Sequence, residues 1–392
     1  MEDNARPTSL IFTIKIYNKS SYRIWIKNLL LIFVFFPYLT PIDTPWSLQP
    51  YALFFSFLFL VTIKHEKIHL NIFYLLIVAL SSILIAVIKL SDLINSLRSV
   101  ANYISMPLII WALYKLNPSS RHVIKFVKLT AIMYFVIGIL QLSVLPGFLS
   151  FLVPHQAGAE FVSSSGRGVS SLTPEPSYFG FIMLLYFFIG IITKEKLLII
   201  ISLFSIVFLS QSFSVISVLV FTLFLFFSLK SFKTFFISIF LSLLLISILV
   251  SVLNNFSTET RSLLLLSNIF TDGFSNTIEN DASATGRLYH ISYPIISSFT
   301  SFFVPFGYNG LPNGDTRILS GIAGAIYELG FFSFILLYVI FNILFCNNFL
   351  KRNLKVGIGI GMLLFLLNAN QVGMPIYCFI LSYFLYSRKI QL

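Results

Sequence analysis

The sequence predicts an all-α polytopic membrane protein with about 12 transmembrane helices. Of its 392 residues, 57% are apolar and 10% are charged, whereas about a quarter of the residues in soluble domains are charged. The apolar residues form runs of the length that a helix needs to cross a hydrocarbon core about 30 Å thick. Lysine and arginine are concentrated on alternate connections between these runs. These observations predict a single integral membrane domain over residues 1–392.

Twelve apolar runs, bounded by charged or turn residues, mark the expected spans. They cover residues 26–41, 47–63, 70–88, 100–116, 129–152, 177–193, 197–211, 213–229, 234–253, 321–345, 356–370 and 374–387. The seventh and eighth runs are short and share the turn "SQSFS".

The basic residues predict the orientation, because lysine and arginine stay on the cytoplasmic side of a membrane. With the N-terminus in the cytoplasm, 20 of the 26 basic residues lie inside and six lie outside. The outer six are Lys89, Arg98, Arg167, Arg261, Arg287 and Arg317. Both termini are therefore expected in the cytoplasm. The basic residues are scattered over short inner connections and form no single stripe, which argues against nucleic-acid binding.

Two outer connections are long and polar, and both are expected on the periplasmic face. The first covers residues 153–176, and the second covers residues 254–320 between spans nine and ten. Apolar stretches in the second, "RSLLLLSNIF" and "ISYPIISSFTSFFVPFG", are too short to span and predict short interfacial helices. Gly286 is expected to open one helix, which would place Arg287 and His290 three residues apart on one face.

Glu175 lies in "TPEPS", where Pro176 suits a first helical turn and the sixth span is expected to begin. A carboxylate is favourable at a helix N-terminus, so Glu175 can be a simple helix-start residue. Arg167 and nearby glycines are also what a site for an anionic ligand uses, and the functional reading is preferred on that ground.

Arg167, Arg287 and Arg317 each lie beside glycine or turn residues, and the long outer connections contain no lysine. The planar fork of arginine suits bidentate contacts with phosphate oxygens, which a lysine cannot reproduce. The three arginines therefore predict a phosphate ligand, whereas Arg261 is read as a solvated residue.

Three further polar positions are candidates for the outer site. His290 is the only histidine of the second long connection, and a lone outer histidine is more often structural or solvated than catalytic. Glu328 lies about two turns into the tenth span, where a carboxylate is costly and marks a function or an internal partner such as an outer arginine. Asn368, Asn370 and Gln371 are expected either to line the same cavity or to bond between helices.

The sequence has no Walker motif, no HExxH, no metal-spaced Cys or His cluster and no DxD pair. These absences predict a reaction without a metal or cofactor, on a substrate that carries its own phosphate activation.

In the order of these features the chain resembles the Wzy-type O-antigen polymerases, within the superfamily of O-antigen polymerases and ligases. The resemblance rests on "EPS" at a helix start after Arg167, on "GR" at 286–287 in a large late loop, and on "FGYNG" and "YELGFF" beyond it. It covers most of the chain in topology and about 40 residues in motif.

The resemblance implies a glycosyltransferase of the bacterial inner membrane with its active site facing the periplasm. Its donor and acceptor would be oligosaccharides linked to undecaprenyl pyrophosphate, and a polysaccharide chain-length regulator is a candidate partner. Arg167 and Arg287, with Arg317 in support, would bind the pyrophosphate. Glu175 or His290 would accept the proton of the acceptor hydroxyl, with Glu328 and Tyr178 in supporting roles.

Two alternatives remain open. An O-antigen ligase, which transfers the glycan to a lipid A core, shares the topology and is favoured by His290, whereas "EPS" favours the polymerase. A transporter of the lipid-linked oligosaccharide usually shows related halves and polar groups near the midplane, but here the polar groups gather at one face.

Overall fold

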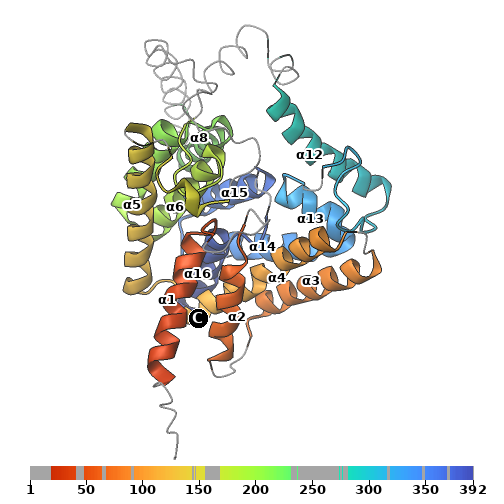
Figure 1. The fold of residues 1–392 in the computed structure, drawn as a ribbon, viewed down its shortest axis with the longest axis horizontal. Coiled ribbons are helices and arrows are strands. Elements are labelled where there is room, and N and C mark those ends of the chain that lie inside the picture. The colour runs from red at the N-terminus through yellow and green to blue at the C-terminus, as the bar shows by residue number, and fades with distance from the viewer. Residues whose placement is uncertain are drawn as a thin grey trace, which may run out of the picture.

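The structure is a computed structural model. It describes residues 19–40, 48–63, 68–89, 92–143, 145, 147–154, 168–230, 236, 273, 276, 281–315, 318–346, 349–368 and 371–391. Every regular element within these ranges is helical. Figure 1 shows the helices as a bundle with α12 lying across one end.

The described residues up to 230 form eight helices and two short helical turns. These are α1 (Lys19–Phe35), α2 (Tyr51–Val61), α3 (Leu70–Ile88), α4 (Leu93–Leu116), α5 (Arg121–Ser143), the 3-10 turn η1 (Ser150–Leu152), α6 (Pro176–Thr193), α7 (Lys196–Phe204), the π-helical turn η2 (Ser205–Ser210) and α8 (Phe213–Ser228).

The second half adds the helices that surround the candidate site. They are α12 (Ala282–Thr300), α13 (Gly321–Leu329), the 3-10 turn η3 (Gly330–Phe332), α14 (Ser333–Phe345), α15 (Arg352–Asn368) and α16 (Pro375–Gln391).

Helices occupy all the expected runs except 234–253, which lies outside the described residues apart from residue 236. Within the part of the chain that the structure describes, four segments are long and apolar enough to cross a membrane: Leu70–Ile88, Arg121–Ser143, Pro176–Thr193 and Gly321–Phe345. Shorter apolar helices cover Tyr51–Val61, Lys196–Ser210, Phe213–Ser228 and Pro375–Ser387. The chain is therefore an all-helical protein of membrane-embedded character.

Two of the helix starts that differ from the sequence-based expectation bear on the candidate site. The fourth run was expected from residue 100, but α4 begins at Leu93, because the Asp92 carboxylate accepts from the backbone N–H groups of Ile94 and Asn95. Gly286 does not open a helix, because α12 already begins at Ala282, where Asp281 accepts from the N–H of Ala284. The first correction places Arg98 inside a helix.

The tenth run is divided at its centre. Gly330 ends α13 with a φ of 56°, and a Cβ atom there would collide with the carbonyl oxygen of Phe303. The chain leaving α12 fills this break, since Phe331 N–H donates to the Phe303 oxygen at 2.9 Å and Phe306 N–H donates to the Tyr327 oxygen at 3.0 Å. The break therefore joins the connection after α12 to the body of the bundle.

The segment before α6 is irregular yet buried among helices. Ser171 and Thr173 are 1% and 3% exposed. The Gln141 side chain on α5 accepts from Ser171 N–H at 2.7 Å and donates to the Ser171 oxygen at 3.0 Å. Gly168 packs so closely on the carbonyl groups of Leu209 and Ser210 that a Cβ would not fit. Side chains and neighbouring backbone thus supply hydrogen-bond partners to the polar backbone groups of a stretch that has no helix of its own.

Replacing Gln141 with leucine tests this arrangement. The variant Gln141→Leu keeps the side-chain volume but leaves both polar backbone groups of Ser171 without their partner, at a cost of about 1–3 kcal/mol for each buried group. We expect a clearly lower thermal unfolding temperature for the detergent-purified protein. Ser217→Ala is the control, because that hydroxyl is exposed and bonds within its own helix; equal unfolding temperatures for the two variants would contradict the account.

Candidate functional site

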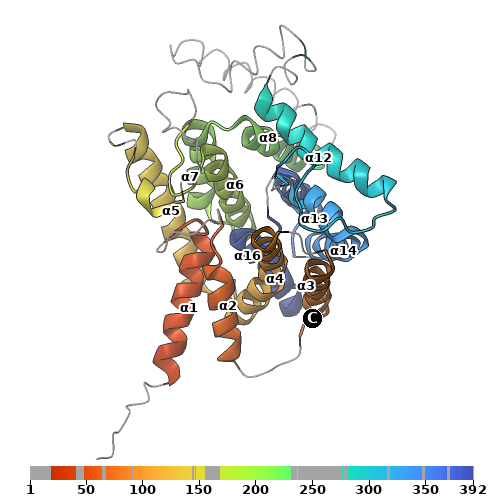
Figure 2. The same cartoon turned by 45° about the vertical axis from the view of Figure 1, so that its right-hand side comes forward.

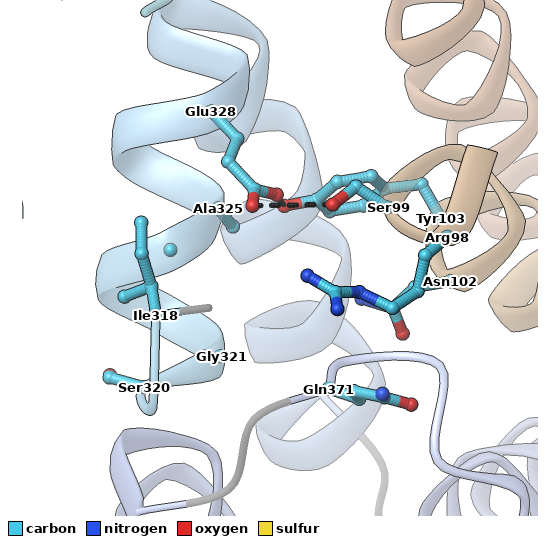
Figure 3. A pocket seen from close by; sticks show the side chains of 11 residues that line it. Arg98, Ser99, Asn102, Tyr103, Ile318, Ser320, Gly321, Ala325, Glu328 and Gln371 are labelled. Carbon is cyan, nitrogen blue, oxygen red and sulfur yellow. Dashed lines mark hydrogen bonds between the residues drawn. The ribbon is translucent and has the colours of Figure 1, made fainter. Parts of the chain in front are cut away.

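A polar pocket lies where the first turns of α4 and α13 meet the connection between α15 and α16 (Figure 3). Its volume is about 40 Å³. Polar side chains from all three elements line it, and its apolar wall consists mainly of small residues. The lining residues are Arg98, Ser99, Asn102, Tyr103, Ile318, Ser320, Gly321, Gly324, Ala325, Glu328 and Gln371.

Helix α4 supplies four of the polar side chains from two adjacent rows. Arg98 and Asn102 are four residues apart, as are Ser99 and Tyr103, so each pair lies on one helix face. The early start of α4 at Leu93 brings both rows to the pocket. Arg98 and Ser99 thus lie within the helix that the Asp92 side chain caps.

Helix α13 supplies the carboxylate. Ser320 caps this helix by accepting from Ala323 N–H at 3.2 Å. Two turns later, Glu328 Oε2 accepts from the Tyr103 hydroxyl at 2.6 Å, and Oε1 lies 3.5 Å from the Ser99 hydroxyl. The carboxylate is therefore held by hydroxyl donors of α4, 225 and 229 residues away in the chain.

Arg98 brings the positive charge. Figure 3 shows its guanidinium pointing into the pocket between the carboxylate of Glu328 and the amide of Gln371. The charges of Arg98 and Glu328 attract each other. The pocket therefore combines one cation and one carboxylate, as expected for a membrane carboxylate with an arginine partner.

The connection after α15 is fixed by Asn102, whose Oδ1 accepts from Gly373 N–H at 2.8 Å. A Cβ at Gly373 would collide with the Asn102 carbonyl oxygen, so this close approach requires glycine. Gln371 lines the pocket, which is one of the two roles expected for it from the sequence. Asn368 instead donates to the Leu364 oxygen of its own helix, and Asn370 lies outside the described residues.

His290 on α12 faces the connection that follows this helix. Its Nε2 lies 3.3 Å from Asp315 Oδ2, and that same oxygen accepts from the Asn313 amide at 2.5 Å. The His290 side chain is 7% exposed, and its Nδ1 is buried with no hydrogen-bond partner among the described residues. Burial lowers the pKa of His290 from its ordinary value of 6.5, and the Asp315 carboxylate partly opposes this shift.

Arg287 and His290 share α12 but have different partners. Arg287 Nη1 donates to the Ser214 hydroxyl at 2.8 Å, at the start of α8. Figures 1 and 2 show α12 reaching from the region of α8 to that of α13, and Tyr289 and Tyr293 pack on the cluster of Leu311, Ile318 and Tyr327. Because Ile318 also lines the pocket, α12 borders the pocket without supplying a side chain to it.

Glu175 occupies the residue before α6, and Pro176 is the first helical residue, as predicted. The Glu175 side chain makes no capping hydrogen bond to the helix. Its Oε2 accepts from the Ser177 hydroxyl at 3.2 Å instead. Tyr178 packs its ring on Tyr38, with centroids 5.6 Å apart. Glu175 is thus a half-buried carboxylate at a helix start that leaves the N–H groups of the helix uncapped.

Arg167 and Arg317, two of the three expected phosphate ligands, lie outside the described residues. Arg98, Ser99, Asn102 and Tyr103 were not predicted as site residues. The sequence contains them as two polar pairs at helical spacing, but the first member of each pair precedes residue 100, where the helix was expected to start. Within the described ranges, no three His, Cys, Asp or Glu side chains gather as a metal site would require.

Comparison with known proteins identifies no relative of this chain. No protein-family model, curated protein or solved structure matches the chain.

The environment of His290 predicts a pH effect on stability. Because burial lowers its pKa in the folded state, the unfolded chain binds more protons below pH 6.5, and folding loses stability as the pH falls below that value. We expect His290→Gln to reduce this acid destabilisation, measured as unfolding temperature against pH. An unchanged difference between neutral and acidic unfolding temperatures would contradict the assignment.

Proposed function

We propose that the chain is a bacterial inner-membrane glycosyltransferase of the Wzy type, which polymerises lipid-linked oligosaccharide repeats at the periplasmic face. The growing glycan moves from undecaprenyl pyrophosphate to a lipid-linked acceptor repeat, and the lipid pyrophosphate leaves. In this proposal the chain spans the membrane twelve times with both termini in the cytoplasm, and the transfer requires no metal.

Contacts between helix ends support this topology. On the expected inner side, Lys128 and Glu195 form an ion pair of 2.5 Å, and the Asn353 amide donates to the Phe226 oxygen. On the expected outer side, Thr40 N–H donates to the Leu152 oxygen, and the Tyr308 hydroxyl donates to the Ser82 oxygen. Each contact joins two segments that the basic residues assign to the same half of the membrane, with Ser82 lying inside α3 and the other residues at or near helix ends or in connections.

The observation that carries the proposal is the polar pocket in an apolar helical protein. Its contributing ends, namely the starts of α4 and α13 and the connection from α15 to α16, are all assigned to the outer face. A guanidinium, a carboxylate, two amides and hydroxyls meet there. A lipid-linked repeat presents sugar hydroxyls just beyond a hydrocarbon chain, and such a pocket at the membrane surface complements them.

The reaction needs charge stabilisation and a base. Arginines of the outer face stabilise the negative charge that develops on the departing pyrophosphate. Arg287 on α12 is described, and Arg167 and Arg317 complete the proposed set. Of the two bases expected from the sequence, His290 has one nitrogen facing Asp315 and the other buried. Glu175 keeps a half-buried carboxylate beside Ser177.

A ligase that transfers the glycan to a lipid A core is the second candidate, and the His290–Asp315 pair in the late loop is the observation that favours it. The lipopolysaccharide of a deletion strain distinguishes the two. A polymerase mutant keeps one repeat on the core, whereas a ligase mutant has a bare core and accumulates lipid-linked polymer.

Purified protein in proteoliposomes tests the reaction directly. Given lipid-linked repeats, the wild-type protein should produce a ladder of longer lipid-linked glycans. Arg287→Gln should slow the reaction by about tenfold or more, because loss of one charge-stabilising donor typically costs about 10²–10³ in rate, whereas Arg261→Gln is the matched control and should behave as wild type. Movement of repeats across the liposome membrane without any lengthening would favour a transporter and contradict the proposal.

A further inference from the structure

The pocket around Arg98 and Glu328 has a composition that selects for a neutral ligand. A carboxylate inside the pocket repels an anion, and a guanidinium inside it repels a cation. A hydroxyl group both donates and accepts, so it can donate to Glu328 and accept from Arg98 at the same time. Mixed charge of this kind suits a sugar hydroxyl better than a free phosphate or a metal ion.

The size of the pocket limits how much of a sugar can enter. Its volume is about 40 Å³, which is room for about three groups the size of a water molecule. That room suits one hydroxyl-bearing edge of a sugar.

One face of α13 leaves space for the hydroxyl-bearing edge of a sugar. Gly321, Gly324, Ala325 and Glu328 follow each other at spacings of three, one and three residues, which places them on the same side of the helix. Small residues therefore lead from the start of α13 to the carboxylate. On the opposite wall, Asn102 uses its oxygen to hold Gly373 and keeps its NH₂ group for another acceptor.

We propose that this pocket binds the hydroxyl-bearing edge of the acceptor sugar and that Glu328 is the catalytic base that deprotonates the hydroxyl. The proposal rests on the glycosyl transfer proposed above, and it replaces Glu175 and His290 in the role of base. The Tyr103 and Ser99 hydroxyls orient the carboxylate, which makes them positioning residues.

The step balances in atoms and charge. The acceptor oxygen forms a bond to the anomeric carbon of the donor glycan, and the bond from that carbon to the pyrophosphate oxygen breaks. The bonding electrons leave with the pyrophosphate, and the hydroxyl proton moves to Glu328. The carboxyl group then returns the proton to water.

The competing explanation is structural, with Arg98 and Glu328 as a charge pair that only joins α4 to α13. A double substitution separates the two readings, because replacing both partners of a partly buried charge pair often restores the stability that a single replacement removes. If the pair were structural, Arg98→Gln combined with Glu328→Gln would recover both folding and activity. If Glu328 is the base, Glu328→Gln alone folds normally and is inactive, and adding Arg98→Gln does not recover activity.

The first experiment measures initial rates of chain lengthening in proteoliposomes against acceptor concentration. Glu328→Gln keeps the shape and the oxygen that accepts from Tyr103, so we expect a normal unfolding temperature and a kcat lower by about 10²-fold or more. The double variant should be equally inactive. A Glu328→Gln rate within about threefold of wild type, or recovery of activity in the double variant, would overturn the proposal.

The second experiment narrows the pocket without removing a polar group. A Cβ at Gly324 would meet Ile318 at 3.5 Å, an ordinary contact, so Gly324→Ala should fold and should not lower the unfolding temperature, since alanine favours a helix over glycine. We expect the KM for the acceptor to rise several-fold. Gln371→Ala should act in the same direction, whereas its control Asn368→Ala should not; an unchanged KM in both pocket variants would contradict sugar binding here.

The outcomes for function and for site are separable. Wild-type protein that never lengthens chains refutes the proposed function together with this inference. A wild-type enzyme whose Glu328→Gln variant is active leaves the function standing and removes Glu328 as the base.

Discussion

The hydrogen bond from the Tyr103 hydroxyl to Glu328 is the contact on which the site depends. It places a carboxylate in an apolar bundle, where an ionisable group is costly unless other groups hold it. The same contact joins α4 to α13 across the pocket. Arg98 adds the opposite charge on the α4 side, so the pocket is close to neutral overall although it contains two ionisable groups.

The surrounding structure holds this pair in place through backbone contacts. The Asp92 cap begins α4 early enough to include Arg98, and Asn102 holds the connection that carries Gln371. The break at Gly330 lets the chain after α12 hydrogen-bond to the end of α13. Irregular backbone therefore occurs where partners satisfy it, and these irregular points border the pocket or α12.

The sequence predicted much of the fold, because apolar runs of membrane length are a strong local signal. It also marked Glu328 as costly and in need of a partner such as an outer arginine. It did not identify Tyr103 as the hydrogen-bond donor to Glu328, because the two residues are 225 positions apart and no local pattern encodes their contact. The start of α4 was placed late because "SDLINSLRS" is too polar for a span, although its helix begins with an ordinary aspartate cap.

Substrate protection of a single cysteine tests the central claim, that the pocket faces outward and binds the lipid-linked sugar. Cys346 is exposed and would be replaced by serine, whereas Cys378 is buried, and Gln371→Cys would supply the reporter. A membrane-impermeant thiol reagent applied to the periplasmic side should modify residue 371, and lipid-linked repeats should slow the reaction more than undecaprenyl pyrophosphate alone. Modification only from the cytoplasmic side, or at a rate unaffected by the repeats, would contradict the account.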